Sequence, residues 1–217
     1  MARLTSLLDL DQDDLQTILL ASYGWNLSRL ALAPARSRAL FFFDSDRPDL
    51  YVAAHVAAAA AGVQLLDVPE RRWAAADGFA TGLVDGVVTA GDVALPADLR
   101  ALPHLALQQR ESAPVDVLAH LTPWYARSAG RTRATVAVGD DAPYCWAVAC
   151  ADLPLDVVHS GARRVDRTFL RQLAAEGQAG SFREGAAPAD VDIDARTAPD
   201  SRLLAAAIAA CLEWVLA

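Results

Sequence analysis

The sequence predicts an α/β protein with mainly parallel sheets flanked by helices, arranged as two lobes with a cleft between them. Short apolar runs typical of buried strands alternate with segments that have helical spacing. Polar turn residues follow two of these runs directly, at Asp44–Asp49 and Gly139–Asp141. A stretch of small, polar and basic residues at 128–133 separates two series of units, which predicts one lobe at 1–130 and a second at 131–200.

The first lobe opens with an amphipathic helix at 7–30, for which Asp11 or Asp13 supplies the N-cap. The proline after Ala113 suits the first turn of a later helix. Between and around these points we expect, in order, a strand Ser37–Phe43, a helix Ala53–Ala61, a strand Val63–Val68, a helix Trp73–Leu83, a strand Asp85–Thr89, a short helix Ala97–Leu102, a strand His104–Gln108 and a helix Pro114–Tyr125.

The second lobe begins with a fully apolar run that ends in Gly139 and two aspartates, followed by a βαβ pattern. Its expected elements are a strand Ala134–Val138, a helix Ala142–Ala151, a strand Leu155–His159, a helix Phe169–Glu176, one or two short strands within Gly180–Ile193, and a strongly apolar last helix Leu203–Leu216. Two successive α/β units therefore make up the chain.

Composition excludes several classes of function. The net charge of −8 disfavours binding to nucleic acid, and no apolar run approaches the ~20 residues that span a bilayer. The N-terminus turns acidic too early for a secretory signal, so we expect a soluble, cytoplasmic protein. The chain has no lysine, which excludes Schiff-base chemistry on that residue. Cys145, Cys150 and Cys211 read as buried thiols, and no residues have metal-ligand spacing, so neither a metal nor a cofactor is expected.

The charged turn after Ser37–Phe43 is the first candidate site. A strand, a turn and a helix that points back at the turn form a common ligand-binding arrangement, because free N–H groups and the helix dipole favour an anion. Here Asp44, Asp46 and Asp49 share the turn with one arginine, Arg47. An anion would meet repulsion as well as attraction, and an Asp-rich turn that caps the helix is the alternative interpretation.

Four stretches and the last helix carry a family resemblance. They read LTSLLDLDQDDLQTILLAS, FFFDSDRPDLYVAAHVAAAAAG, VDGVVTAG, APVDVLAHLTPW followed by TVAVGDDAP, and DSRLLAAAIAACLEWVLA. In order and spacing they resemble the aspartate/ornithine carbamoyltransferase family over nearly the whole chain. The resemblance implies two lobes, with the final helix at 201–217 returning to pack on the first lobe, a truncated second lobe, and assembly as a trimer.

The departures from the family pattern bear on function. The family's Ser-Thr-Arg-Thr-Arg phosphate loop falls on Arg47–Tyr51, where no cradle of hydroxyls and arginines remains. Its His-Pro-x-Gln falls on Ala113–Asp116, and Ala90 replaces an arginine. Asp192 runs almost directly to the final helix, so the His-Cys-Leu-Pro loop is missing. Each lost charged contact costs a few kcal/mol of binding or transition-state stabilisation. These departures from the family pattern therefore predict a protein that has lost carbamoyl phosphate binding.

Four residues are candidates for acid–base catalysis. Asp49 lies in the turn, where the three carboxylates could raise one another's pKa. His55 follows Tyr51 by one helical turn, and Asp116 and His120 form an i,i+4 pair on one helix face. The alternatives are an ordinary turn, a half-buried histidine with satisfied hydrogen bonds, and a solvated helix pair.

Further residues are candidates for substrate binding. They lie in the turn, at the end of the first strand of the second lobe, or on the helix that links the lobes, where tryptophans could line an apolar pocket. Helix capping and core packing are the alternative interpretations. The candidates are Asp44, Asp46, Arg47, Tyr51, Trp124, Asp140 and Asp141. Trp73 and Trp146 are further tryptophans that could line the pocket.

Three functions compete. The first is a repurposed, cofactor-independent enzyme of bacterial specialised metabolism that cyclises, dehydrates or isomerises a small neutral or cationic molecule in the interdomain cleft. The second is a catalytically inactive carbamoyltransferase homologue that acts as a binding or assembly partner. The third is a residual amino-acid carbamoyltransferase. The sequence favours the first by a narrow margin.

Overall fold

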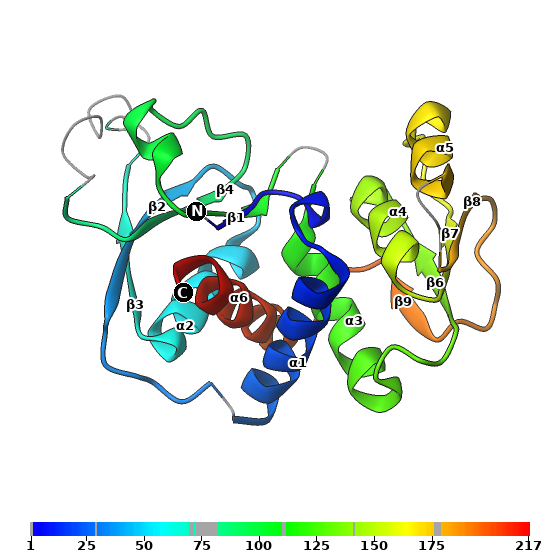
Figure 1. Ribbon diagram of the computed structural model, residues 1–217, viewed down its shortest axis with the longest axis horizontal. Helices are drawn as coiled ribbons and strands as arrows, with labels where there is room; N and C mark the ends of the chain where they lie inside the picture. Colours follow the sequence, from blue (N-terminus) through cyan, green and yellow to red (C-terminus); the bar gives the residue numbers. More distant parts are fainter. Residues whose placement is uncertain are drawn as a thin grey trace.

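The computed structural model describes residues 2–28, 30–69, 72, 82–109, 112–140, 142–175 and 179–217 (Figure 1). Two lobes lie side by side, each built on its own parallel sheet, and both ends of the chain lie at the first lobe. No helix in this described part of the chain is long and apolar enough to cross a membrane. The Trp73–Leu83 helix expected from the sequence falls largely outside the described residues.

The first sheet is parallel throughout and contains one strand that the sequence did not predict, the two-residue β1. Its central strands are short apolar runs with almost every residue buried, the pattern of a sheet covered on both faces. The order across the sheet is β1 (Arg3–Leu4), β5 (His104–Gln108), β4 (Gly86–Ala90), β2 (Ser37–Phe43) and β3 (Val63–Asp67). A 3-10 helix, η4 (Asp98–Ala101), joins β4 to β5.

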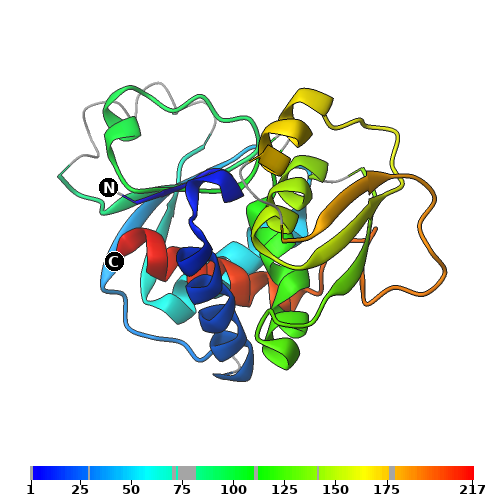
Figure 2. The same ribbon diagram turned by 45° about the vertical axis from the view of Figure 1, so that its right-hand side comes forward.

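A layer of helices covers one face of this sheet. Figures 1 and 2 show α6 (Ser201–Leu216) lying between α1 (Gln12–Ser28) and α2 (Pro48–Ala61), with α3 (Pro114–Ser128) beside it. Small alanine side chains on α2 and α6 are buried where the two helices meet, which allows close packing at high density. α6 therefore packs against α1, α2 and α3.

The second sheet is also parallel, and its strand order is β8 (Ser181–Glu184), β7 (Leu155–His159), β6 (Ala134–Val138) and β9 (Ile193–Ala195). Two further helices belong to this lobe, α4 (Pro143–Asp152) and α5 (Arg167–Ala175). One apolar core runs from the first lobe through α3 into the inner side of the second sheet. The α/β class with two parallel sheets is confirmed, whereas the division into lobes at 1–130 and 131–200 stays a prediction.

The N-terminal segment differs from expectation in one respect. A single helix at 7–30 was predicted, but the structure has a 3-10 turn η1 (Leu7–Asp9) and a separate α1. Ser6 accepts a hydrogen bond from the Leu8 N–H, and the Asp9 carboxylate accepts one from the Ser6 N–H, which forms a capping box around η1. Ser6 and Asp9 thus cap η1 as a separate turn before α1 begins.

Candidate functional site

A cavity of about 400 Å³ lies between the two lobes and is the predicted interdomain cleft. The carboxyl ends of parallel strands meet a helix N-terminus here, as is usual for ligand sites in α/β folds. The elements that contribute to its lining are the start of α2, the end of β5, α3, the segment after β6, α4 and the connection from β9 to α6. The lining residues include Arg47, Asp116, His120, Asp140, Trp146 and Thr197.

Arg47 is held by two carboxylates at the start of α2. Its Nη1 donates a 2.6 Å hydrogen bond to Asp116 Oδ2, and its Nη2 donates one of 2.7 Å to Asp49 Oδ2. Burial opposes the positive charge of Arg47, but the two carboxylates outweigh it and keep its pKa above the ordinary value. The guanidinium is thus compensated from within the protein.

Asp49 behaves differently from the sequence-based expectation. The hydrogen bond from Arg47 lowers the pKa of Asp49 below its ordinary value, against a smaller opposing effect of burial. The hypothesis that the clustered carboxylates raise one another's pKa is therefore wrong for Asp49, because an adjacent cation outweighs like-charge repulsion. Its role in the structure is that of an ion-pair partner at the helix start.

His120 lies in the cleft one helical turn after Asp116, as the i,i+4 spacing predicted. Its ring centroid is 6.2 Å from that of Trp146 on α4. Burial lowers the pKa of His120, while a hydrogen bond with the Thr197 backbone and the charge of Asp194 oppose the shift. The lowered pKa favours the neutral imidazole, which is the form that accepts a proton.

Asp140 reaches the cleft from the carboxyl end of β6. Its Oδ1 accepts a hydrogen bond of 2.9 Å from the backbone N–H of Arg163, and this contact lowers the pKa of Asp140. A Cβ on Gly161 would stand 2.2 Å from the same oxygen, so the loop after β7 closes tightly over the carboxylate. Asp140 thus fixes this loop as well as lining the cleft.

His55 and Tyr51 do not line the cleft. Their ring centroids are 4.6 Å apart on the outer side of α2, which confirms that they share a helix face. Both contact Asp67 at the end of β3: Tyr51 Oη donates to Oδ2 at 3.0 Å, and His55 Nε2 lies 3.2 Å from Oδ1. Tyr51 and His55 therefore find their hydrogen-bond partner in Asp67, outside the cleft.

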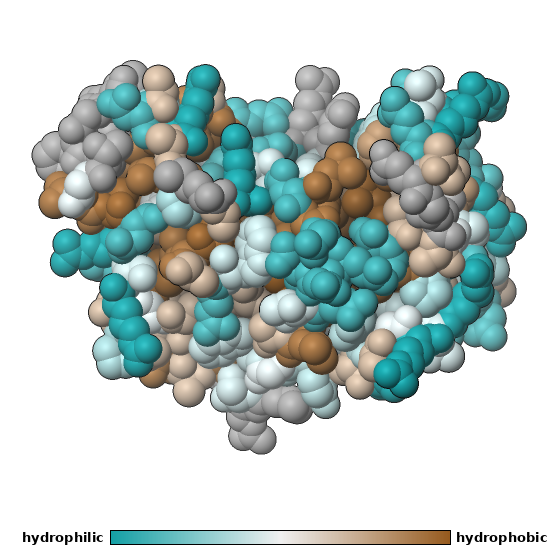
Figure 3. Space-filling view, in the orientation of Figure 1, coloured by the Kyte–Doolittle hydropathy of each residue, from teal (hydrophilic) through white to brown (hydrophobic). Residues whose placement is uncertain are grey.

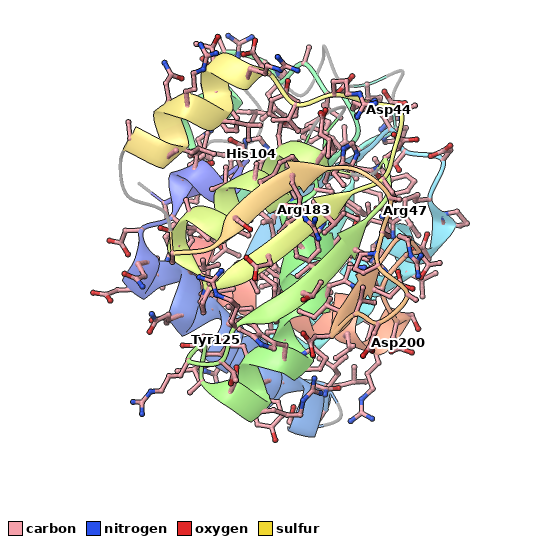
Figure 4. The ribbon with its side chains drawn as sticks, turned by 90° about the vertical axis from the view of Figure 1, so that its right-hand side faces the viewer. Asp44, Arg47, His104, Tyr125, Arg183 and Asp200 are labelled. Atoms are coloured by element: carbon pink, nitrogen blue, oxygen red, sulfur yellow. The ribbon has the colours of Figure 1, made fainter. Side chains whose placement is uncertain are left out.

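Asp44 and Asp46 line a separate hollow of about 330 Å³ at the same sheet edge, and this hollow adjoins the cleft through Gln108. Figure 4 shows Asp44 and Arg47 along one side of the molecule. Ser45 Oγ donates a 2.9 Å hydrogen bond to Gln108 Oε1, which ties the acidic turn to the end of β5. The acidic turn therefore borders the cleft and does not form its floor.

Two of the tryptophan predictions have different outcomes. Trp124 is only 4% exposed and packs against Tyr125 in the core, so core packing, the alternative interpretation, describes it. Trp146 does line the cleft. Trp73 and the predicted binding residue Asp141 lie outside the described residues.

Sequence reasoning missed five polar residues of the cleft. Gln108 ends β5, Gln109 and Ser112 follow it, and the signal that could have found them is a run of polar residues at the carboxyl end of a predicted strand. Arg163, which follows β7, also lines the cleft. Thr197 gave no such signal, because its position depends on how the chain crosses from β9 to α6. Within the described residues no group of three or more His, Cys, Asp or Glu could hold a metal ion.

Comparisons with known proteins identify the fold. No protein-family model matches the sequence, and no curated protein matches it. The ornithine carbamoyltransferase from Thermus thermophilus has a similar structure, with a TM-score of 0.71 at 13% identity over 99% of both chains. The enzyme from Pyrococcus furiosus gives 0.67 at 22% identity, covering 84% of this chain and 66% of that one. That from Gloeobacter violaceus gives 0.66 at 17%, covering 85% and 68%. The chain has the carbamoyltransferase fold.

Proposed function

We propose that this protein with the carbamoyltransferase fold is a small-molecule enzyme that has lost carbamoyl phosphate binding and works by acid–base catalysis in the cleft. The observation that carries the proposal is the pairing of Arg47 with Asp49 and Asp116, beside a neutral His120. Fold alone does not imply function, so the argument rests on these side chains.

The two ion pairs of Arg47 support the loss of carbamoyl phosphate binding. An anion needs a cation or free N–H groups that are not already engaged. Arg47 stands at the start of α2, where an anion would bind, but its charge is balanced by two carboxylates. To bind a phosphate, Arg47 would have to give up at least one ion pair, and the phosphate would then face Asp116.

His120 is the proposed general base. Its neutral imidazole would take a proton from a bound substrate and return it to a different atom of the same molecule, so that an isomerisation needs no external reactant. Asp116 and Trp146, which line the same cleft, would orient the substrate. Cyclisation and dehydration use the same proton transfers, the latter with release of water. A small neutral or cationic molecule suits this lining.

Asp49 and His55 are not proposed to take part in proton transfer. Asp49 holds Arg47, and His55 contacts Asp67 outside the cleft. Asp44, Asp46 and Asp140 lie near enough to the cleft to influence a cationic ligand through their charge. We further propose a cytoplasmic location and a role in bacterial specialised metabolism, without a metal or cofactor.

A thermal-denaturation screen tests the function. The ligands are phosphate, carbamoyl phosphate, a bisubstrate phosphonate analogue, and a set of small amines, guanidines and neutral polyols. A ligand at ~100 times its dissociation constant adds about 2.7 kcal/mol, which raises the melting temperature by several degrees. We expect no response to the phosphates and a response to at least one neutral or cationic compound. A response to carbamoyl phosphate alone would reinstate a carbamoyltransferase.

One observation favours the second candidate function, an inactive homologue that assembles with a partner or with itself. The outer side of α2 exposes Val52 and Val56, which are 60% and 40% accessible. With Leu30 and Ala205 they line an open hollow of about 580 Å³. Apolar surface of this kind is typical of interfaces. Sedimentation analysis of the purified protein tests it, and the family resemblance leads us to expect a trimer.

A further inference from the structure

A second cavity, of about 270 Å³, lies next to the cleft. Gln109 and Ser112 line both cavities, so the two hollows meet at the turn between β5 and α3. On its other sides the second cavity is bounded by η1 of the first lobe and by α4 and α5 of the second. It therefore lies at the junction of the lobes, as the cleft does.

The second cavity is mainly apolar. Leu8, Val148 and Phe169 contribute to its lining, and the Phe169 ring lies 5.4 Å from that of Tyr144. Leu8, which lines the second cavity, is 58% exposed. Figure 3 shows apolar atoms at the surface between the lobes, close to η1 and α4. A ligand that covered Leu8 would remove this apolar surface from water.

Polar residues also line the second cavity: Gln109 and Ser112 at the wall it shares with the cleft, and Ser6 and Asp92 elsewhere. Gln109 N–H donates to the Ser112 carbonyl at 2.6 Å, and Ser112 N–H donates to the Gln109 carbonyl at 3.3 Å. Ser112 Oγ donates to the Thr5 carbonyl and lies 3.3 Å from Cys145 Sγ. Gln109 and Ser112, the residues common to both cavities, are therefore held by hydrogen bonds.

We propose that the second cavity binds an apolar six-membered ring, carried by a ligand whose neutral or cationic end lies in the cleft near Asp116. The size is sufficient, since a dry apolar cavity of about 150 Å³ in another protein already admits benzene. The substrate of the proposed enzyme is then an amphiphilic molecule, such as an arylalkylamine, rather than a fully polar metabolite. The assignment of the polar end rests on the proposed function, whereas that of the ring rests on the second cavity alone.

Methyl NMR of leucine and valine side chains can test the two cavities separately. Val148 and Leu8 report on the second cavity, Val117 on the cleft, and Val52 on the exposed face of α2. The probes are phenol for the ring, ethylamine for the polar end, and 2-phenylethylamine for the two joined. We expect phenol to shift Val148 and Leu8 but not Val52, and 2-phenylethylamine to bind at least tenfold more tightly than ethylamine.

Two variants sharpen the test. Val148→Phe fills the second cavity, and Leu8→Ser changes an exposed residue that the fold does not need; each should weaken phenol binding severalfold while leaving the Val117 response to ethylamine unchanged. Equal shifts at Val148 and Val52, or none at Val148, would overturn the ring site. If 2-phenylethylamine bound no more tightly than phenol, the joined ligand would be refuted. If the probes shifted the methyl signals of Val148 but none shifted those of Val117, the proposed function would be refuted and the ring site supported.

Discussion

Arg47 Nη1 and Asp116 Oδ2 are 2.6 Å apart, a contact that joins the start of α2 to the first turn of α3. The two residues are far apart in sequence, and both side chains are largely buried, with 20% and 13% of their surface exposed. A charge-assisted hydrogen bond of this length in a partly buried place makes each partner dependent on the other.

Replacement of Arg47 by methionine should destabilise the protein by about 1–3 kcal/mol, because Asp116 would be left partly buried without its cation. Urea unfolding at pH 7 measures the loss. Arg133→Met is the matched control: its ion pair with Asp156 is exposed, so its loss should stay below about 1 kcal/mol. Equal losses in the two variants would show that the Arg47 contact is no stronger than a surface pair.

The double variant Asp49→Asn, Asp116→Asn should create an anion site. It removes both carboxylates that balance Arg47, while the guanidinium and the helix start remain. Phosphate should then raise the melting temperature of the variant by a few degrees and leave that of the natural protein unchanged. A natural protein that already responds as strongly as the variant would contradict the argument from charge balance.

His120 should titrate below the ordinary histidine value in NMR. Burial is the main cause of its lowered pKa, and the charge of Arg47 contributes in the same direction. Arg47→Met should therefore move the pKa of His120 upward. The protein has four histidines, and His120→Asn identifies the resonance. If the pKa of His120 stayed constant in Arg47→Met, the charge of Arg47 would have no influence on the proposed base.

His104 should make stability depend on pH. It is buried with its Nε2 2.9 Å from Thr89 Oγ1, and burial lowers its pKa from 6.5 to about 4, with help from Arg3 and opposition from Asp9. Above pH 6.5 both folded and unfolded states carry the neutral ring. Between pH 6.5 and 4 only the unfolded state takes up the proton, so the free energy of unfolding should fall by about 3 kcal/mol.

The difference between the natural protein and His104→Gln isolates this contribution, because the carboxylates titrate in both. Urea unfolding from pH 7 to pH 4 should show a shallower loss in the variant. Parallel curves for the natural protein and His104→Gln would place the acid sensitivity elsewhere.

Two glycine substitutions should have opposite effects. Gly91 has φ of +93°, and a Cβ there would stand 1.8 Å from the Asp44 carbonyl oxygen, so Gly91→Ala should cost at least about 2 kcal/mol. Gly24 lies within α1 with nothing within 4 Å of an added Cβ, so Gly24→Ala should stabilise the protein by about 0.5–1 kcal/mol. Thermal and urea denaturation measure both. A tolerated Gly91→Ala would mean that the acidic turn adapts at little cost.

Local pattern predicted the elements well where burial and turn chemistry agree. Ser37–Phe43 and Ala134–Val138 were placed to the residue, since continuous apolar runs between polar turns have few other solutions. The two-residue β1 was missed because a strand of that length has no period of its own. It exists only through its pairing with β5.

The site was predicted less completely. The i,i+4 rule brought Asp116 and His120 together on one face, and the tertiary structure then turned that face into the cleft. The same rule paired Tyr51 with His55 equally well, yet their face points out of the cleft. Helical spacing tells which residues are neighbours, but which side faces the other lobe is decided by long-range packing.

The position of α6 in the first lobe has a consequence for biosynthesis. The partners α1 and α2 are made early, whereas α6 follows the whole second lobe in the chain. The growing polypeptide must therefore keep the apolar faces of α1 and α2 uncovered until α6 emerges. During that interval these faces are a place for chaperone binding or aggregation, and synthesis interrupted after β9 would leave a first lobe without its central helix.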